Sequence, residues 1–81
     1  MSLLDAATAL AERTRVELEA KGYSPPLARA AVERARKTAF QRAQPLSPSI
    51  REQGYCDILA FELQHAEEWA TKVVSGMAAQ K

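Results

Sequence analysis

Residues 49–79 decide the fold, and they read SIREQGYCDILAFELQHAEEWATKVVSGMAA. They contain no proline and only two glycines, Gly54 and Gly76. The apolar side chains recur at helical spacing and share one face, namely Tyr55, Ile58, Leu59, Leu63, Ala66, Trp69, Ala70, Val73 and Met77. The pattern predicts one long amphipathic C-terminal helix, in which Gly54 is the candidate point for a kink or a break.

The predicted helix is long for a chain of 81 residues. About 28 helical residues span roughly 42 Å, whereas a compact chain of this length is only about 30 Å across. The rest of the core is thin, because much of the 47% hydrophobic content is alanine. We therefore expect another copy of the chain to cover part of the helix, in a homo-oligomer and most simply a homodimer.

Two further helices precede this segment. Ser2 with Asp5 three residues later resembles a capping box, and Gly22 is a typical residue to end the helix that begins there. Ser24 followed by Pro25 begins a second helix. We predict a single all-α domain over residues 1–81, an antiparallel bundle completed by oligomerisation, with helices at about 3–21, 25–43 and 49–79.

Two starts compete for the C-terminal helix. Ser49 with Glu52 three residues later makes a capping box. Ser47 followed by Pro48 is the other start, since proline fits the first helical position.

The composition excludes several classes of protein. A single cysteine, Cys56, rules out an internal disulfide framework and a cysteine-rich zinc site. No apolar run approaches the length of about 18 residues that a membrane span needs, and no basic region precedes an apolar run near the N-terminus. We expect a cytoplasmic protein.

Catalytic motifs are also missing from the sequence. It has no glycine-rich phosphate loop. Cys56 and His65 lie about 13 Å apart along one predicted helix, which is too far for a nucleophile and its base within one chain. We therefore predict that the chain is not an enzyme and that Cys56 packs as a small apolar residue.

Charge is unevenly distributed, although the net charge is only +1. Residues 23–45 carry one acidic residue, Glu33, and five basic residues: Arg29, Arg34, Arg36, Lys37 and Arg42. One interpretation is charge complementarity within the chain or between subunits. The other is a face for an acidic partner or for nucleic acid, whose binding would be weak and would depend on Arg29, Arg34, Arg36 and Lys37.

Two phenylalanines lie away from the apolar stripes. On a helical wheel Phe40 falls among Arg29 and Arg36, and Phe61 falls among polar residues of the C-terminal helix. Either the bundle buries more than one face of each helix, or these rings are anchors for another chain. Aromatic side chains beside arginines are typical of protein–protein hot spots. We predict a partner-binding set of Phe40, Arg29, Arg36, Phe61 and Trp69.

Glu62 lies inside the apolar stripe, and a buried carboxylate needs a partner. The expected partner is an arginine of the second helix, from this chain or from a neighbouring copy. The alternative is a metal, because Glu62 and His65 form a Glu-x-x-His pair that resembles half of the di-iron site in ferritin-like bundles. That resemblance implies further ligands from another helix, such as Glu12, Glu17 or Glu33. We expect the arginine, and we predict no metal and no cofactor.

The sequence thus predicts a small helical protein-interaction module, namely an adaptor, regulator or inhibitor that binds another protein and forms a homodimer. A small protein encoded by a phage or another mobile element fits this description. The alternatives are a nucleic-acid-binding regulator that uses the basic second helix, and a ferritin-like metal-binding protein that uses Glu62 and His65.

Overall fold

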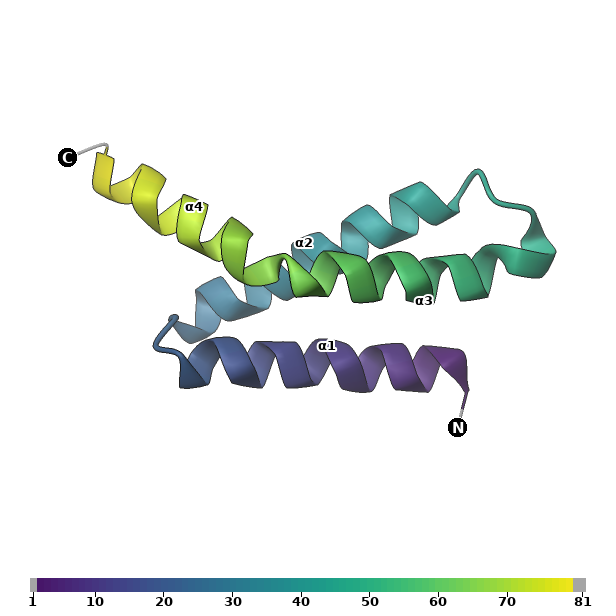
Figure 1. Cartoon of the computed structure of the whole chain (residues 1–81), viewed down its shortest axis with the longest axis horizontal. Helices are drawn as coiled ribbons and strands as arrows, with labels where there is room; N and C mark the ends of the chain where they lie inside the picture. Colours follow the sequence, from purple (N-terminus) through teal and green to yellow (C-terminus); the bar gives the residue numbers. More distant parts are fainter. Residues whose placement is uncertain (1, 80–81) are drawn as a thin grey trace.

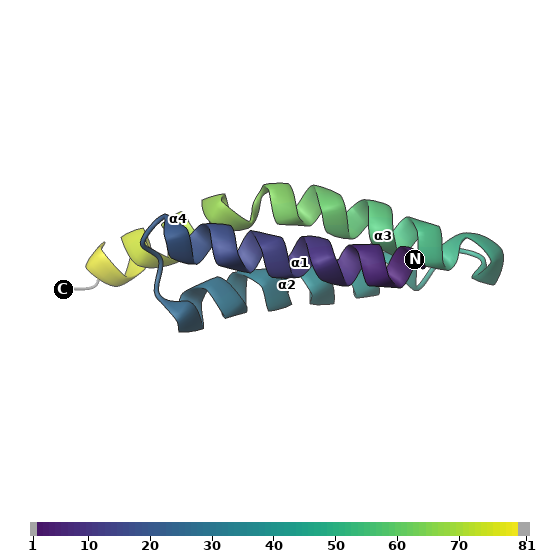
Figure 2. The same ribbon diagram turned by 90° about the horizontal axis from the view of Figure 1, so that it is seen from below.

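The computed structural model describes residues 2–79, which form four helices and no strand. These are α1 (Leu3–Ala20), α2 (Pro25–Ala43), α3 (Pro48–Gln64) and α4 (Ala66–Ala79). Helices α1 and α3 run in the same direction with α2 antiparallel to both, and α4 turns away from the line of α3 (Figure 1). The molecule measures 48 × 25 × 15 Å, and Figure 2 shows how thin it is in the second view. The predicted all-α class is confirmed.

The predicted ends of the first helix are confirmed. Ser2 Oγ accepts a hydrogen bond of 3.1 Å from the backbone N–H of Asp5. At the other end Gly22 has a φ of +102°, a conformation that glycine adopts without a steric cost. The N–H of Tyr23 then donates to the carbonyl oxygen of Leu18 at 3.1 Å. This is the hydrogen bond that defines a Schellman motif, and it redirects the chain into α2.

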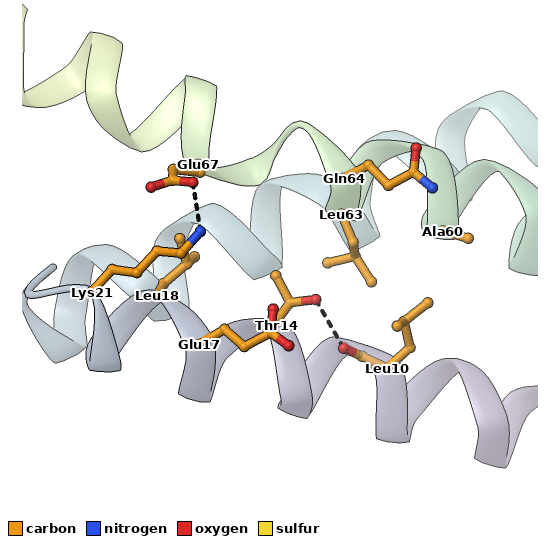
Figure 3. A pocket seen from close by; sticks show the side chains of 9 residues that line it. All are labelled: Leu10, Thr14, Glu17, Leu18, Lys21, Ala60, Leu63, Gln64 and Glu67. Atoms are coloured by element: carbon orange, nitrogen blue, oxygen red, sulfur yellow. Dashed lines mark hydrogen bonds and ion pairs between the residues drawn. The ribbon is translucent and has the colours of Figure 1, made fainter.

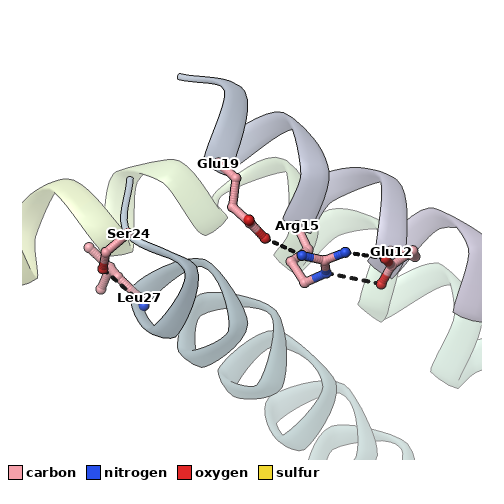
Figure 4. Close-up of polar contacts among 5 residues, drawn as sticks. All are labelled: Glu12, Arg15, Glu19, Ser24 and Leu27. Atoms are coloured by element: carbon pink, nitrogen blue, oxygen red, sulfur yellow. Dashed lines mark hydrogen bonds and ion pairs between the residues drawn. The ribbon is translucent and has the colours of Figure 1, made fainter. Parts of the chain in front are cut away.

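The starts of the next two helices follow the proline signals. Ser24 Oγ accepts a hydrogen bond of 3.4 Å from the N–H of Leu27 (Figure 4). Helix α3 begins at Pro48 with Ser47 as its N-cap residue. Of the two competing starts, the observed one is therefore Ser47 with Pro48 and not Ser49.

The predicted long helix over residues 49–79 is two helices in the structure. The chain remains helical through Gly54 and turns at His65, whose φ and ψ are −102° and 7°. The N–H of His65 donates to the carbonyl oxygen of Glu62 at 3.1 Å, three residues back, and its own carbonyl accepts from Trp69 N–H at 3.2 Å. Because of this turn, the length of a continuous helix no longer argues for an oligomer.

The core is divided into two clusters, and this division explains the turn. The first lies among α1, α2 and α3 and consists of Ala7, Ala11, Val32, Ala35, Ala39, Leu59 and Leu63. The second includes the start of α4 and consists of Leu18, Ala28, Ala31, Ala66 and Ala70. The turn at His65 places the two alanines of α4 in contact with this second cluster. Because most core residues are alanine, the helices can approach closely but bury little apolar area each.

Within residues 2–79, no helix has both the length and the apolar character that crossing a membrane requires.

Candidate interaction surface

The Glu62 carboxylate is buried and is held by two arginines of α2. Its side chain is only 7% exposed; Oε1 lies 3.1 Å from Arg42 Nη1 and Oε2 lies 3.7 Å from Arg34 Nη1. The two arginines are two helical turns apart, so they approach the carboxylate from both directions along α2. The guanidinium carbon of Arg34 also lies 5.9 Å from the centroid of the Trp69 ring. The predicted pairing of Glu62 with an arginine of the second helix is confirmed, and it links α2, α3 and α4.

His65 does not share this environment. Its Nδ1 lies 3.4 Å from Glu68 Oε1, and its ring centroid lies 4.7 Å from that of Phe61. The two residues of the Glu-x-x-His pair therefore have separate sets of partners. In the part of the chain that the structure describes, no three His, Cys, Asp or Glu side chains are grouped so that they could hold a metal ion.

The outer surface of α2 carries a regular row of exposed residues. Six residues of this helix are buried toward its neighbours: Ala28, Ala31, Val32, Ala35, Ala39 and Ala43. On the opposite side four exposed residues follow one another at spacings of three, four and three. We call this row the outer α2 face, and its members are Ala30, Glu33, Lys37 and Phe40.

Phe40 is the most exposed large apolar side chain among the described residues, at 60%. Two hollows adjoin it, and both are also lined by Tyr55 of α3. The first, of about 400 Å³, lies where the start of α1, the end of α2 and the start of α3 meet, and it includes Leu4. The second, of about 570 Å³, is lined by charged residues that include Arg36 and Lys37. Phe40 thus stands between an apolar and a basic region of the surface.

The structure does not bring the five predicted partner-binding residues into one site. Arg29 and Arg36 line a groove of about 400 Å³ between α1 and α2, and Phe40 continues the exposed side of α2. Phe61 lies on α3 against His65, and Trp69 is half-buried next to Arg34. Both phenylalanines are more than half exposed, so the interpretation that this chain's own bundle buries them is wrong.

Tyr55 belongs to the predicted core stripe, and no sequence pattern placed Leu4 on the surface around Phe40. Tyr55 packs partly against the first core cluster and also lines both hollows beside Phe40. Leu4 lies at the start of α1, whereas Tyr55 lies near the middle of α3. No local signal in the sequence would bring them together beside Phe40.

Most of the basic side chains of α2 are already paired. Arg34 and Arg42 bind Glu62, and Arg36 Nη1 lies 3.2 Å from Glu33 Oε1. On α1, Arg15 binds Glu12 and Glu19 (Figure 4), and its hydrogen bonds lower the pKa of Glu12. Within residues 2–79, Arg29 and Lys37 are the two basic side chains of α2 that form no ion pair.

A smaller groove lies between α1 and the junction of α3 and α4 (Figure 3). It has a volume of about 260 Å³, and its apolar lining includes Leu10, Leu18 and Leu63. Lys21 Nζ lies 2.8 Å from Glu67 Oε1 at one end of the groove. This hydrogen bond lowers the pKa of Glu67 and raises that of Lys21. These two charged groups therefore already compensate each other and fasten α4 to the end of α1.

Cys56 is not placed as a nucleophile. Its Sγ lies 3.4 Å from the carbonyl oxygen of Leu3, and its side chain packs partly against the first core cluster. Burial raises the pKa of its thiol, whereas a reactive cysteine needs a lowered pKa.

Comparison of the chain with protein-family models, with curated proteins and with solved structures finds no match.

Proposed function

We propose that the chain is a small helical protein-interaction module, namely an adaptor, regulator or inhibitor, and that it binds through the outer α2 face. The observation that supports this proposal is the exposure of Phe40 between two hollows. Full burial of such a side chain is worth about 1.5–3 kcal/mol, and the alanine-rich core leaves the fold little surplus stability. An aromatic ring beside Arg36 combines two residue types that are enriched at protein–protein interfaces.

The nucleic-acid alternative receives less support from the geometry. A duplex-binding protein typically neutralises several phosphates with lysine and arginine side chains. Of the five basic residues on α2, three are already paired with Glu33 or Glu62. Arg29 and Lys37 remain, which is too few for tight binding of a phosphate backbone.

The proposal can be tested by site-specific photo-crosslinking in cells of the source organism. The photoreactive amino acid p-benzoylphenylalanine would replace Phe40 in one variant and Arg13, an exposed residue of α1, in the control. We expect a covalent adduct of defined mass from position 40 and none from position 13. Mass spectrometry then shows whether the captured protein is another copy of the chain or a different protein. Equal labelling at both positions, or no adduct from position 40, would contradict the proposal.

A further inference from the structure

We infer that the outer α2 face binds the same face of a second copy of the chain, with the two α2 helices antiparallel. This inference rests on the proposed function and names the partner. The four residues of the face are exposed, and their spacing of three, four and three reads the same in both directions. A two-fold axis perpendicular to α2, at the level of residue 35 along the helix, therefore pairs position 30 of one copy with position 40 of the other. The same axis pairs position 33 with position 37.

The residue types at these positions are complementary in the antiparallel arrangement. Glu33 of each copy faces Lys37 of the other, which gives two ion pairs across the axis. Phe40 of each copy faces Ala30 of the other, whose small side chain leaves room for the ring. A parallel pair in register would instead place Glu33 against Glu33 and Lys37 against Lys37, so the charges select the antiparallel orientation.

The same charges favour a second copy over an acidic partner. Glu33 lies in the middle of the outer α2 face, next to Lys37, and the face is not uniformly basic. An acidic helix placed along it would bring a carboxylate against Glu33. Glu33 already pairs with Arg36 of its own helix, and a second copy adds Lys37 as a further opposite charge while Lys37 gains a carboxylate.

The position of the face leaves space for a second copy. Helices α1, α3 and α4 all pack on α2, through its buried residues. A second α2 can reach the four exposed residues of the outer α2 face from the other side.

Charge reversal tests the inference, with the dissociation constant of the dimer measured by analytical ultracentrifugation from micromolar to millimolar concentration. Glu33→Lys places a lysine opposite Lys37 of the second copy at two symmetric sites, and Lys37→Glu creates the corresponding acidic clash. We expect each single variant to weaken the dimer by about tenfold or more. Glu33→Lys combined with Lys37→Glu in one chain restores opposite charges at both sites and should return the constant to within about threefold of the original.

The two single variants mixed in equal amounts give a sharper readout. One chain then carries two basic residues at positions 33 and 37 and the other carries two acidic residues, so both contacts are complementary in the heterodimer. We expect the mixture to form a heterodimer more readily than either variant forms a homodimer. Phe40→Ser should also weaken the dimer, whereas Phe61→Ser, at an exposed phenylalanine of α3, should leave it unchanged. Circular dichroism checks that every variant keeps its helices.

Two results would overturn the inference. The first is a monomer at millimolar concentration, and the second is a dimer that neither Phe40→Ser nor charge reversal weakens. The crosslinking experiment at position 40 distinguishes a failure of this inference from a failure of the proposed function. If position 40 captures a different protein and not a second copy, the dimer is wrong but the interaction module is supported.

Discussion

Glu62 Oε1 lies 3.1 Å from Arg42 Nη1 across the interface between α2 and α3, and the two partners differ greatly in exposure. The Glu62 side chain is 7% exposed, whereas those of Arg34 and Arg42 are 40% and 60% exposed. Without Glu62, both arginines can turn into water. Without the arginines, the carboxylate stays buried with no opposite charge. Removing the two arginines should therefore lower the free energy of unfolding more than removing Glu62.

We expect Arg34→Met combined with Arg42→Met to lower the free energy of unfolding by about 3–5 kcal/mol, the typical cost of leaving a buried charge without its partner. Glu62→Leu should cost about 1 kcal/mol or less, because a buried pair can be replaced by apolar side chains with little loss. Urea unfolding at neutral pH, followed by circular dichroism at one fixed protein concentration, measures both.

Arg36→Met is the matched control for this comparison. Arg36 pairs with Glu33 at the surface, where both side chains are well exposed, so its loss should change stability by about 0.5 kcal/mol or less. A larger loss for Glu62→Leu than for the double arginine variant would show that the carboxylate, and not its partners, stabilises the cluster.

The residues that could be predicted from the sequence are those whose signal is local. Ser2, Gly22 and Ser24 mark helix ends through their own backbone preferences, and the position of Glu62 in an apolar stripe demanded a basic partner. The turn at His65 had no such signal, because no proline or glycine lies there. It depends on contacts between distant segments, with Ala66 packed against α2.

The exposure of the candidate surface was predictable only in part. The wheel position of Phe40, among charged residues, indicated that the ring faces outward, and it does. Tyr55 has a core position on its own helix, yet it also lines the hollows beside Phe40. A helical wheel reports the direction of a side chain but not where the neighbouring helices end.

The side chain of Leu46, in the connector between α2 and α3, packs on Gly54 of α3. A Cβ atom at this position would overlap Cδ1 of Leu46, and Leu46 Cγ would lie 3.7 Å away. In an open helix interior, alanine in place of glycine gains about 1 kcal/mol. We expect Gly54→Ala to gain less than this, because the overlapping atom is the end of the Leu46 side chain, which must turn aside.

Two variants complete this test by urea unfolding. With Leu46→Ala already present, Gly54→Ala should give a larger gain, since the overlapping side chain is gone. Gly76→Ala is the control, because no heavy atom lies within 4 Å of a Cβ built there, and it should be neutral or stabilising. If Gly54→Ala stabilises the original chain as much as it stabilises the Leu46→Ala chain, the Leu46 side chain does not pack on Gly54.

Cys56 should react slowly with thiol reagents in the folded protein. Burial raises the pKa of its thiol, and only the thiolate attacks an alkylating reagent. We expect iodoacetamide at about pH 8 to label the native chain much more slowly than the urea-unfolded chain. Labelling is followed by mass spectrometry, and equal rates in the two states would mean that the start of α1 does not cover the thiol.

The contact between Lys21 and Glu67 should make the docking of α4 sensitive to acid. The hydrogen bond from Lys21 lowers the pKa of Glu67 in the folded chain, so over the interval between the folded and unfolded pKa values the folded state binds fewer protons. The stability from this contact is therefore fully present above the ordinary glutamate pKa of about 4.3 and is lost as pH falls through the lowered value. The pKa of Lys21 is raised, so the contact also weakens at high pH, as the medium passes that raised value.

Thermal unfolding of the original chain and of Glu67→Gln, from about pH 7 down to about pH 3, measures this effect. We expect the original chain to have the higher midpoint near pH 7 and the difference to shrink toward zero in acid. Lys21→Met should also remove this pH-dependent contribution to the unfolding midpoint, because it removes the donor that lowers the pKa of Glu67. Glu52→Gln is the control, since Glu52 is exposed and forms no ion pair within residues 2–79. A midpoint difference for Glu67→Gln that stays constant across this range would show that the carboxylate contributes by packing and hydrogen bonding in both protonation states, and not by its charge.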